Sequence, residues 1–175
     1  MATFNIDPAH SEIQFKVKHL VITTVTGHFK KFEGSLQSEK DDFSDAKISF
    51  KAETNSIDTN NEQRDGHLKS DDFFNAEKFP FITFTSKELK KTSGNKYKLS
   101  GELTIRDITK SIELDAEYNG TAIDPWGNTK VGFELSGSIN RFDYQLKWNA
   151  LTEAGGAMVG ADIKLALNIQ LVKAA

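Results

Sequence analysis

Hydrophobic and polar residues alternate with a period of two along most of this 175-residue chain. Such alternation places one face of an extended segment in an apolar interior and the other in water, as in antiparallel strands. The longest alternating stretches occupy residues 12–18, 47–53, 111–118, 131–139 and 163–171. Shorter strands are expected at residues 24–32, 33–38, 81–87, 96–100 and 102–106. The pattern therefore predicts an all-β protein.

Turn-forming residues separate these strands, and two segments favour a helix instead. The breaks lie at residues 40–45, 92–95, 119–128 and 152–156. Residues 60–70, followed by 71–74, are expected to form a short helix, with Thr59 or Asn60 as its N-cap. Residues 142–146 form a weaker helical candidate. At this length we expect one domain over residues 1–175.

Strand length limits the architecture. A strand of about nine residues spans about 30 Å, and roughly eight such strands can close into a barrel or split into a sandwich. Closure removes exposed strand edges. A barrel of about eight strands has room for side chains or for one small ligand.

Charge and composition exclude several function classes. The net charge of −3 argues against an electrostatic grip on nucleic acid, which needs a clustered basic face. The absence of cysteine excludes disulfides, thiolate metal sites and a cysteine nucleophile. His10, His19 and His28 lie nine residues apart, which is not metal-ligand spacing, so we expect no metal. No G-x-S-x-G elbow occurs, which argues against a hydrolase.

The N-terminal residues predict where the protein resides. The segment Met1–Asp7 has neither the basic nor the apolar region of a secretory signal. No apolar run approaches the ~18 residues needed to span a bilayer. As written, the sequence predicts a cytoplasmic protein; a chain trimmed of a leader would be periplasmic.

The segment from Ser56 to Ser86 concentrates the candidate chemistry. It places large apolar rings beside titratable groups, which suggests a lid or wall over an apolar cavity. Arg64 and His67 are three residues apart and share a helix face. Arg64 and Asp65 could tie the helix to the barrel, with His67 packed beside them. Alternatively, the group could contact an anionic head group or act in acid–base catalysis.

Several short motifs, taken in order, resemble those of the YceI-like family. They are Ile6-Asp7-Pro8-Ala9-His10-Ser11, Lys18-His19-Leu20, Gly27-x-Phe29-x-x-Phe32-x-Gly34, Ser56-Ile57-Asp58-Thr59, Arg64-Asp65-Gly66-His67-Leu68, Asp72-Phe73-Phe74, Phe79-Pro80, Gly101–Ile105 with Thr109-Lys110, Ile139-Asn140-Arg141 and Val159-Gly160. Known members have a lipocalin-like barrel and bind polyisoprenoids or similar lipids. The segment Phe142–Gln145 lacks the glycine that is usual in the family after the Asn-Arg pair.

Together with the alternation, the resemblance implies an antiparallel, lipocalin-like β-barrel with a short helix near one rim. Such a barrel would bind, sequester or carry a long-chain apolar ligand in an internal tunnel. The ligand classes are a polyisoprenoid, an isoprenoid quinone and a fatty-acid-like lipid. Desolvation of the tail would drive binding. No cofactor is expected beyond a bound lipid.

The thirteen phenylalanines could fill an ordinary core or line this cavity. For the wall we expect Phe15, Phe29, Phe50, Phe84, Phe133, Leu135 and Leu165. Phe73, Phe74 and Phe142 are candidate rim residues. Arg64, His67 and Arg141 are candidate head-group contacts.

Two other functions stay open at this point. One is an enzyme acting on an isoprenoid or lipid, with His67 and an acid in acid–base roles, although no recognisable catalytic motif supports it. The other is a filled, ligand-free barrel that acts through its surface as a stress-related interaction module. The expected partner is a long-chain lipid; transient membrane contact and a homodimer are both compatible with the sequence.

Overall fold

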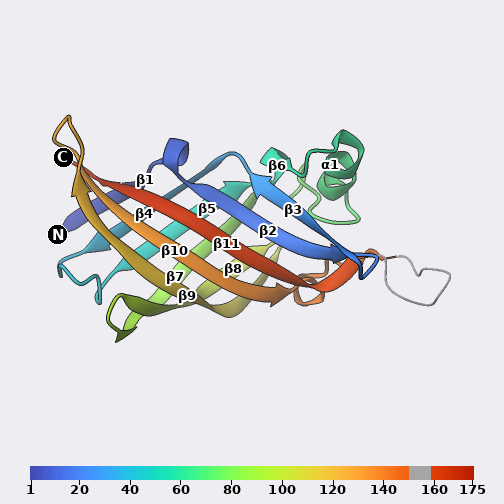
Figure 1. The fold of residues 1–175 in the computed structure, drawn as a ribbon. Helices are drawn as coiled ribbons and strands as arrows, with labels where there is room; N and C mark the ends of the chain where they lie inside the picture. The colour runs from blue at the N-terminus through green and yellow to red at the C-terminus, as the bar shows by residue number, and fades with distance from the viewer. Residues whose placement is uncertain (150–158) are drawn as a thin grey trace.

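Antiparallel pairing of neighbouring strands closes the sheet into an elongated barrel (Figure 1). The structure is a computed structural model that describes residues 1–149 and 159–175. Within these residues the strands β1, β4, β5, β7, β8, β9, β10 and β11 form the ring, and a β1–β11 pairing closes it. The predicted antiparallel barrel with one short helix is confirmed. No described helix has the length and apolar character to cross a membrane.

The ring strands are β1 (Ala2–Ile6), β4 (Phe32–Ser38), β5 (Lys47–Glu53), β7 (Phe81–Ser93), β8 (Lys96–Ile105), β9 (Ile108–Ile123), β10 (Thr129–Asn140) and β11 (Val159–Lys173). The sheet extends beyond the ring through β2 (Glu12–His19), β3 (Thr23–Phe29) and β6 (Ile57–Asp58). The helix α1 spans Glu62–Lys69, and three 3₁₀ turns are η1 (Pro8–His10), η2 (Thr54–Ser56) and η3 (Arg141–Tyr144).

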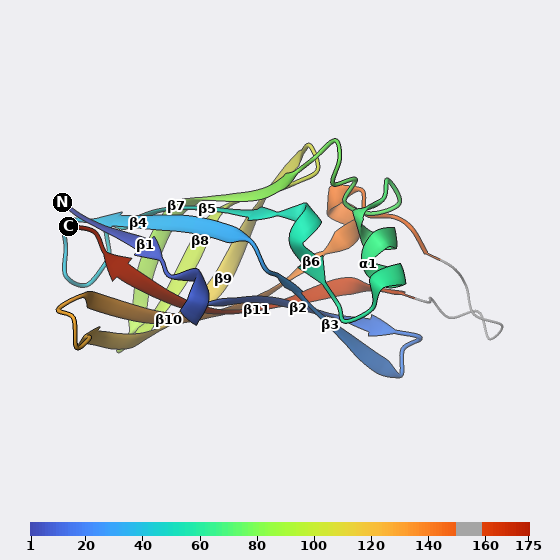
Figure 2. The same ribbon diagram turned by 90° about the horizontal axis from the view of Figure 1, so that it is seen from above.

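Three long strands are each interrupted by a short break, so that β1 continues as β2, β3 as β4, and β5 as β6. The turn η1 separates β1 from β2, and both pair with β11. Residues 30–31 separate β3 from β4, and η2 separates β5 from β6. Past these breaks, β2, β3 and β6 extend toward the end that carries α1, while both chain termini lie at the opposite end (Figures 1 and 2). The barrel therefore has two different ends.

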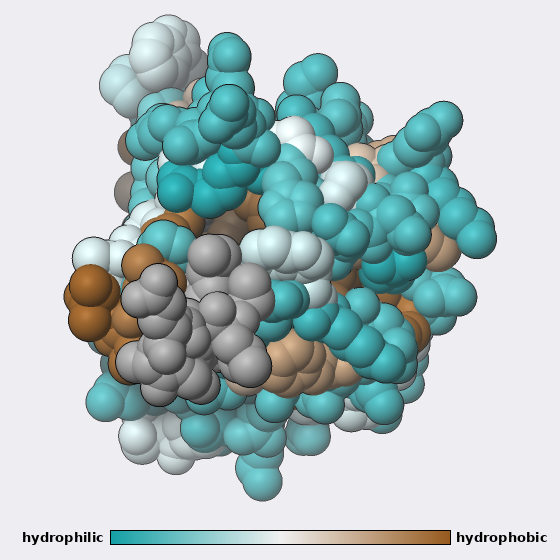
Figure 3. Space-filling model, turned by 90° about the vertical axis from the view of Figure 1, so that its right-hand side faces the viewer, coloured by the Kyte–Doolittle hydropathy of each residue, from teal (hydrophilic) through white to brown (hydrophobic). Residues whose placement is uncertain are grey.

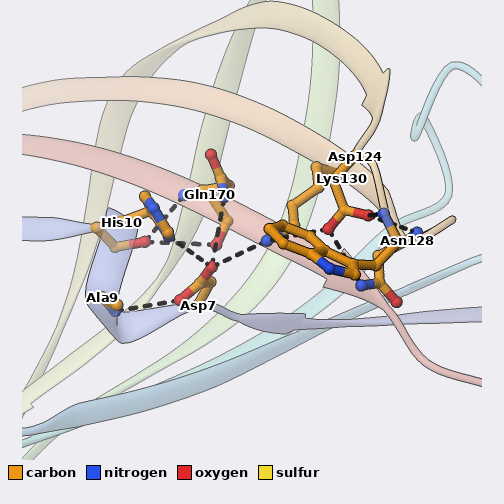
Figure 4. Close-up of polar contacts among 9 residues, drawn as sticks. Asp7, Ala9, His10, Asp124, Asn128, Lys130 and Gln170 are labelled. Carbon is orange, nitrogen blue, oxygen red and sulfur yellow. Dashed lines mark hydrogen bonds and ion pairs between the residues drawn. The ribbon is translucent and has the colours of Figure 1, made fainter.

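A polar cluster fixes the seam where β1 gives way to β2 (Figure 4). The carboxylate of Asp7 lies 2.9 Å from His10 Nδ1 and accepts from Lys130 Nζ at 3.2 Å and from Gln170 Nε2 at 3.4 Å. The hydrogen bond with His10 contributes most to lowering the pKa of Asp7, and Lys130 adds to it. Asp124 accepts from Asn128 in the β9–β10 turn. These contacts join η1 to β10 and β11.

An aromatic plug closes the end of the barrel that carries the termini. Phe43, in the β4–β5 loop, is buried and adopts a left-handed conformation with φ 59°. Its ring centroid lies 5.7 Å from those of Phe4, Tyr118 and Phe133. The Tyr97 hydroxyl donates to the carbonyl of Asp42 at 2.7 Å and holds the loop in place. We call this the closed end.

Asp45 holds the base of the same loop and gives the fold an acid-sensitive contact. Its carboxylate accepts from Ser38 Oγ at 2.6 Å, from Glu39 N at 2.9 Å and from Lys40 N at 3.2 Å. These bonds, that of Ser38 first, lower the pKa of Asp45 from 3.8 to about 2. The carboxylate therefore stabilises the fold above about pH 4, and this contribution is lost as pH falls toward about 2.

The variant Asp45→Asn tests this role of the carboxylate. In thermal melts between about pH 4 and pH 2, the Tm of the variant should fall less steeply with pH than the Tm of the wild type, because the variant has no carboxylate to protonate. Equal slopes for the two proteins would contradict the assignment.

The predicted elements differ from the observed ones where backbone details override the pattern. The strand β1 was not predicted, because only Phe4 and Ile6 mark its short alternation. The two segments predicted at 96–106 form the single strand β8. The predicted break at 119–128 begins later, since β9 continues to Ile123 through Gly120 at φ 122°. The predicted break at 152–156 lies outside the described residues.

Candidate functional site

An apolar cavity of about 330 Å³ opens inside the end of the barrel beneath α1. Away from α1, its wall consists almost entirely of aliphatic and aromatic side chains from the inward faces of the strands. A second cavity of about 100 Å³ lies deeper, toward the closed end. Both cavities share lining residues, which we call the neck: Ile13, Phe50, Phe84, Leu114 and Leu167. The barrel interior therefore contains two apolar cavities that share the residues of the neck.

Glycines opposite two phenylalanines keep part of this space free. Phe15 pairs across the sheet with Gly27, and its ring lies over that glycine, within 2.2–2.9 Å of where a Cβ would be. Phe84 lies similarly over Gly101, at 2.6–2.9 Å. A side chain at either glycine would push the ring away from the wall. Two large residues therefore line the wall without crossing the lumen.

The helix α1 is tied to the rim by its first turn. Asn61, rather than the predicted Thr59 or Asn60, is the N-cap, and its Oδ1 accepts from Arg64 N at 3.0 Å. Arg64 donates to Thr59 Oγ1 at 2.7 Å and to the Thr59 carbonyl at 2.6 Å. Asp65 accepts from Thr59 N at 2.8 Å and from its hydroxyl at 2.5 Å. Arg64 and Asp65 therefore both tie α1 to Thr59 through hydrogen bonds.

An aromatic cluster covers the cavity beside the helix. The His67 ring makes edge contacts with Phe73 and Trp148. Its centroid lies 5.1 Å from that of Phe73 and 4.7 Å from that of Trp148. His67 Nε2 lies 2.8 Å from Asp72 Oδ2. Arg106, in the β8–β9 turn, donates to the carbonyls of Asp71 and Phe73 and pairs with the Asp71 carboxylate. Because these contacts hold residues 70–74 against the rim, the cluster roofs the cavity.

Arg141 is committed to the protein itself, which corrects its prediction as a head-group contact. It lines the cavity but is only 2% exposed. Its guanidinium donates to the carbonyls of Leu146, Trp148, Val159 and Gly160 at 2.6–3.2 Å. Burial lowers the pKa of this guanidinium. Arg141 therefore joins the end of β10 to the start of β11.

Phe142 also departs from its predicted place. It lies outside the residues that line either cavity, is 39% exposed, and packs its ring on the Arg141 guanidinium at 4.6 Å. The segment that lacks the family's usual glycine forms the turn η3, and Gln145 ends it at φ 63°. Only one short turn forms there because Gln145 leaves the helical conformation.

The structure places the other predicted residues along the lumen. Those that line the large cavity are Phe15, Phe29, Phe50, Phe73, Phe74, Phe84, Leu165, Arg64 and His67. Phe133 and Leu135 line the deeper one. Trp148 also lines the large cavity but lies in a segment without alternation, which gave no sign of this place. Lys18 and His19 line it too, although in sequence they alternate as ordinary strand residues. Lys18 and His19 belong to the motif Lys18-His19-Leu20, which was the available signal for them.

Charge is distributed unevenly over this lining. The ionisable side chains on the large cavity, within the described residues, are all basic: Lys18, His19, Arg64, His67 and Arg141. They come from the end of β2, from α1 and from η3, which Figure 1 places at one end of the barrel. Among the described residues that line the deeper cavity, only Ser35 and Ser49 have polar side chains. Figure 3 looks onto this end, where apolar residues lie recessed among polar ones. We call this end the mouth.

Comparisons with known proteins agree with this architecture. A UPF0312 protein of Staphylococcus epidermidis is 41% identical over 165 residues, which cover 94% of each chain. The crystal structure of a YceI protein of Campylobacter jejuni is 35% identical, with a TM-score of 0.76 over 90% of each chain. A polyisoprenoid-binding domain of Saccharophagus degradans has the same fold, with a TM-score of 0.70 over 97% of each chain at 15% identity. The YceI-like domain model matches residues 4–171, and the chain therefore belongs to the YceI-like family.

Proposed function

We propose that this protein binds one long-chain lipid, with its apolar tail in the two cavities and its polar head at the mouth. The observation that carries the proposal is the gradient along the lumen: apolar side chains line the depth, and basic ones gather at the mouth. A volume of about 330 Å³ lies within the range of small-molecule sites, roughly 300–1,000 Å³. An amphipathic ligand matches both parts.

Desolvation of the tail supplies the affinity. Each methylene moved from water into the cavity contributes about 0.8 kcal/mol. Summed over a long tail, this gain would nominally approach the ceiling near 20 kcal/mol for non-covalent complexes. Ordering the tail, and removing it from the lipid phase it leaves, offset most of this gain. The net affinity is then moderate, which suits a protein that takes up and releases its cargo.

The basic mouth favours a head group that accepts hydrogen bonds or carries negative charge. Arg64 forms no ion pair with a carboxylate among the described residues, although Thr59 accepts two of its hydrogen bonds. A guanidinium can hold a carboxylate or phosphate oxygen through its remaining donors. The polyisoprenoid-binding domain of S. degradans, which shares this fold, supports a polyisoprenoid as one ligand class.

Native mass spectrometry of freshly purified protein tests the proposal. We expect a lipid that travels with the chain and that organic extraction releases. The proposal would be contradicted if gently purified protein had the mass of the polypeptide alone and took up neither added polyisoprenoid nor long-chain fatty acid. That result would favour the ligand-free interaction module.

An enzyme on the same lipid is the second candidate, favoured by the 2.8 Å contact of His67 with Asp72 at the mouth. The variant His67→Ala separates the two. Under our proposal it retains most lipid binding, since His67 contributes one ring to the roof. If His67 is catalytic, the wild type should convert the bound lipid to a product and the variant should not. Removing an acid–base group lowers the reaction rate by about 10²–10⁴-fold. Lipid recovered chemically intact from both proteins excludes that role for His67.

A further inference from the structure

The tip of the β2–β3 hairpin exposes apolar side chains on a strained backbone, which favours neither stability nor solubility. Leu20, Val21 and Ile22 are all exposed, Val21 to 69% and Ile22 to 81%. The turn closes through Ile22 N, which donates to the His19 carbonyl at 3.3 Å. Leu20 and Val21 both adopt left-handed conformations, with φ 52° and 67°.

Such a turn suits Asn-Gly, and the left-handed region costs roughly 1–2 kcal/mol for each residue with a Cβ. The chain therefore accepts backbone strain in order to present apolar side chains to solvent. Contiguous exposed apolar residues of this kind mark interaction sites.

The hairpin is continuous with the mouth of the cavity. Val17, Lys18 and His19 on β2, and Val25 on β3, line the large cavity just below the exposed tip. Figures 1 and 2 place the hairpin at the same end as α1. Figure 3 looks onto this end and shows apolar residues projecting at its left edge, beside a mostly polar rim. A surface that covered the tip would therefore face the opening.

The charge around the tip identifies that surface. No aspartate or glutamate occurs from Ile13 to Phe32, although the chain as a whole carries a net charge of −3. Lys16 and Lys18 are exposed and form no ion pair with a described residue. An apolar tip with two exposed lysines on the strand below it is an arrangement that can insert into a lipid interface, where lysines meet the head groups.

We propose that the β2–β3 hairpin docks the mouth of the barrel on a phospholipid bilayer by inserting Leu20, Val21 and Ile22 among the head groups. The docked orientation brings the cavity against the membrane, so that a lipid tail can pass between them without crossing water. Docking goes beyond the proposed function, because vesicle binding can be measured whether or not the cavity holds cargo.

The chain supplies its own matched control. Ile123, the last residue of β9, and Trp126, in the β9–β10 turn, are 72% and 83% exposed. Figure 1 shows this turn at the opposite, closed end. If exposed apolar residues bound bilayers merely by being exposed, this turn would contribute as much as the β2–β3 hairpin.

The experiment is co-sedimentation of the full chain with vesicles of phosphatidylcholine, and of an equal mixture of phosphatidylcholine and phosphatidylglycerol. We expect Val21→Ser with Ile22→Ser to lower the vesicle partition coefficient by about tenfold or more, because two apolar side chains no longer insert. Ile123→Ser with Trp126→Ser should leave it within about twofold of wild type. The mixed vesicles should bind more tightly, because the lysines attract anionic head groups.

A second variant excludes unfolding as the cause. Leu20→Asn with Val21→Gly gives the turn the residues it favours, and should raise Tm by roughly 2–4 °C while vesicle binding falls. A variant that is more stable and yet binds less supports docking through the tip.

Three results would overturn the proposal: no vesicle binding by the wild type, equal loss at both ends, or retention by both tip variants. A wild-type dimer that the tip variants convert to monomer, without vesicle binding, would assign the tip to a second copy of the chain. Because native mass spectrometry detects bound lipid independently, a failure of docking leaves the proposed function standing.

Discussion

Replacing Arg141 with leucine is expected to destabilise the barrel by about 3–5 kcal/mol. The guanidinium is buried and donates to four backbone carbonyls, those of residues 146, 148, 159 and 160. Leucine fills similar space but leaves those carbonyls without donors in an apolar setting, and each unsatisfied buried group costs about 1–3 kcal/mol. Chemical denaturation monitored by tryptophan fluorescence, to which the packed Trp148 contributes, measures the loss.

Arg141→Lys is the matched control for that experiment. Lysine retains the charge, but its donors all lie on one ammonium nitrogen, whereas the donors of the planar guanidinium are spread over three nitrogens. Lysine therefore cannot reach all four carbonyls. We expect a loss between those of wild type and the leucine variant. Equal stability of all three proteins would mean that the converging carbonyls find other partners, and would remove Arg141 from the framework of the mouth.

Replacing Leu167 with tryptophan is expected to change which lipid the protein holds, with little loss of stability. Leu167 belongs to the neck between the two cavities, so an indole there separates the deep cavity from the large one. If the variant excludes about five methylenes of tail, the binding free energy falls by about 4 kcal/mol. Mass spectrometry of the extracted lipid should then show shorter tails, or no lipid.

Asn168→Trp provides the control, because Asn168 is the next residue along β11 and its exposed side chain points away from the lumen. It should retain the wild-type lipid profile. If Leu167→Trp instead costs more than about 3 kcal/mol of stability, the indole meets packed side chains and the neck is solid core. Identical lipid profiles in all three proteins would contradict the tunnel.

Periodicity predicted the walls of this barrel because a half-buried strand repeats every two residues. The inward positions of β2, β5, β10 and β11 were predicted from that repeat, and all seven expected wall residues line one of the two cavities. Periodicity could not show whether inward rings meet or leave a space. That depended on Gly27 and Gly101, which let Phe15 and Phe84 lie back against the wall.

The roles of the arginines could not be predicted for a different reason. Arg64, Arg106 and Arg141 all look like candidate anion sites in sequence, because a guanidinium favours carboxylate and phosphate. In the structure each donates to backbone carbonyls at the mouth: Thr59 for Arg64, Asp71 and Phe73 for Arg106. Backbone carbonyls carry no side-chain signature, so a cation that binds them is indistinguishable in sequence from one that binds a ligand.

The pairing of β1 with β11 has a practical consequence for handling the molecule. Ala174 N donates to the Thr3 carbonyl at 2.7 Å, so the first and last residues meet side by side at the end remote from α1. A short linker could join them and allow new ends to be cut at another loop, and a surface tether attached at either terminus would hold every molecule with its opening facing outward. Immobilised this way, the protein would present its mouth to the medium.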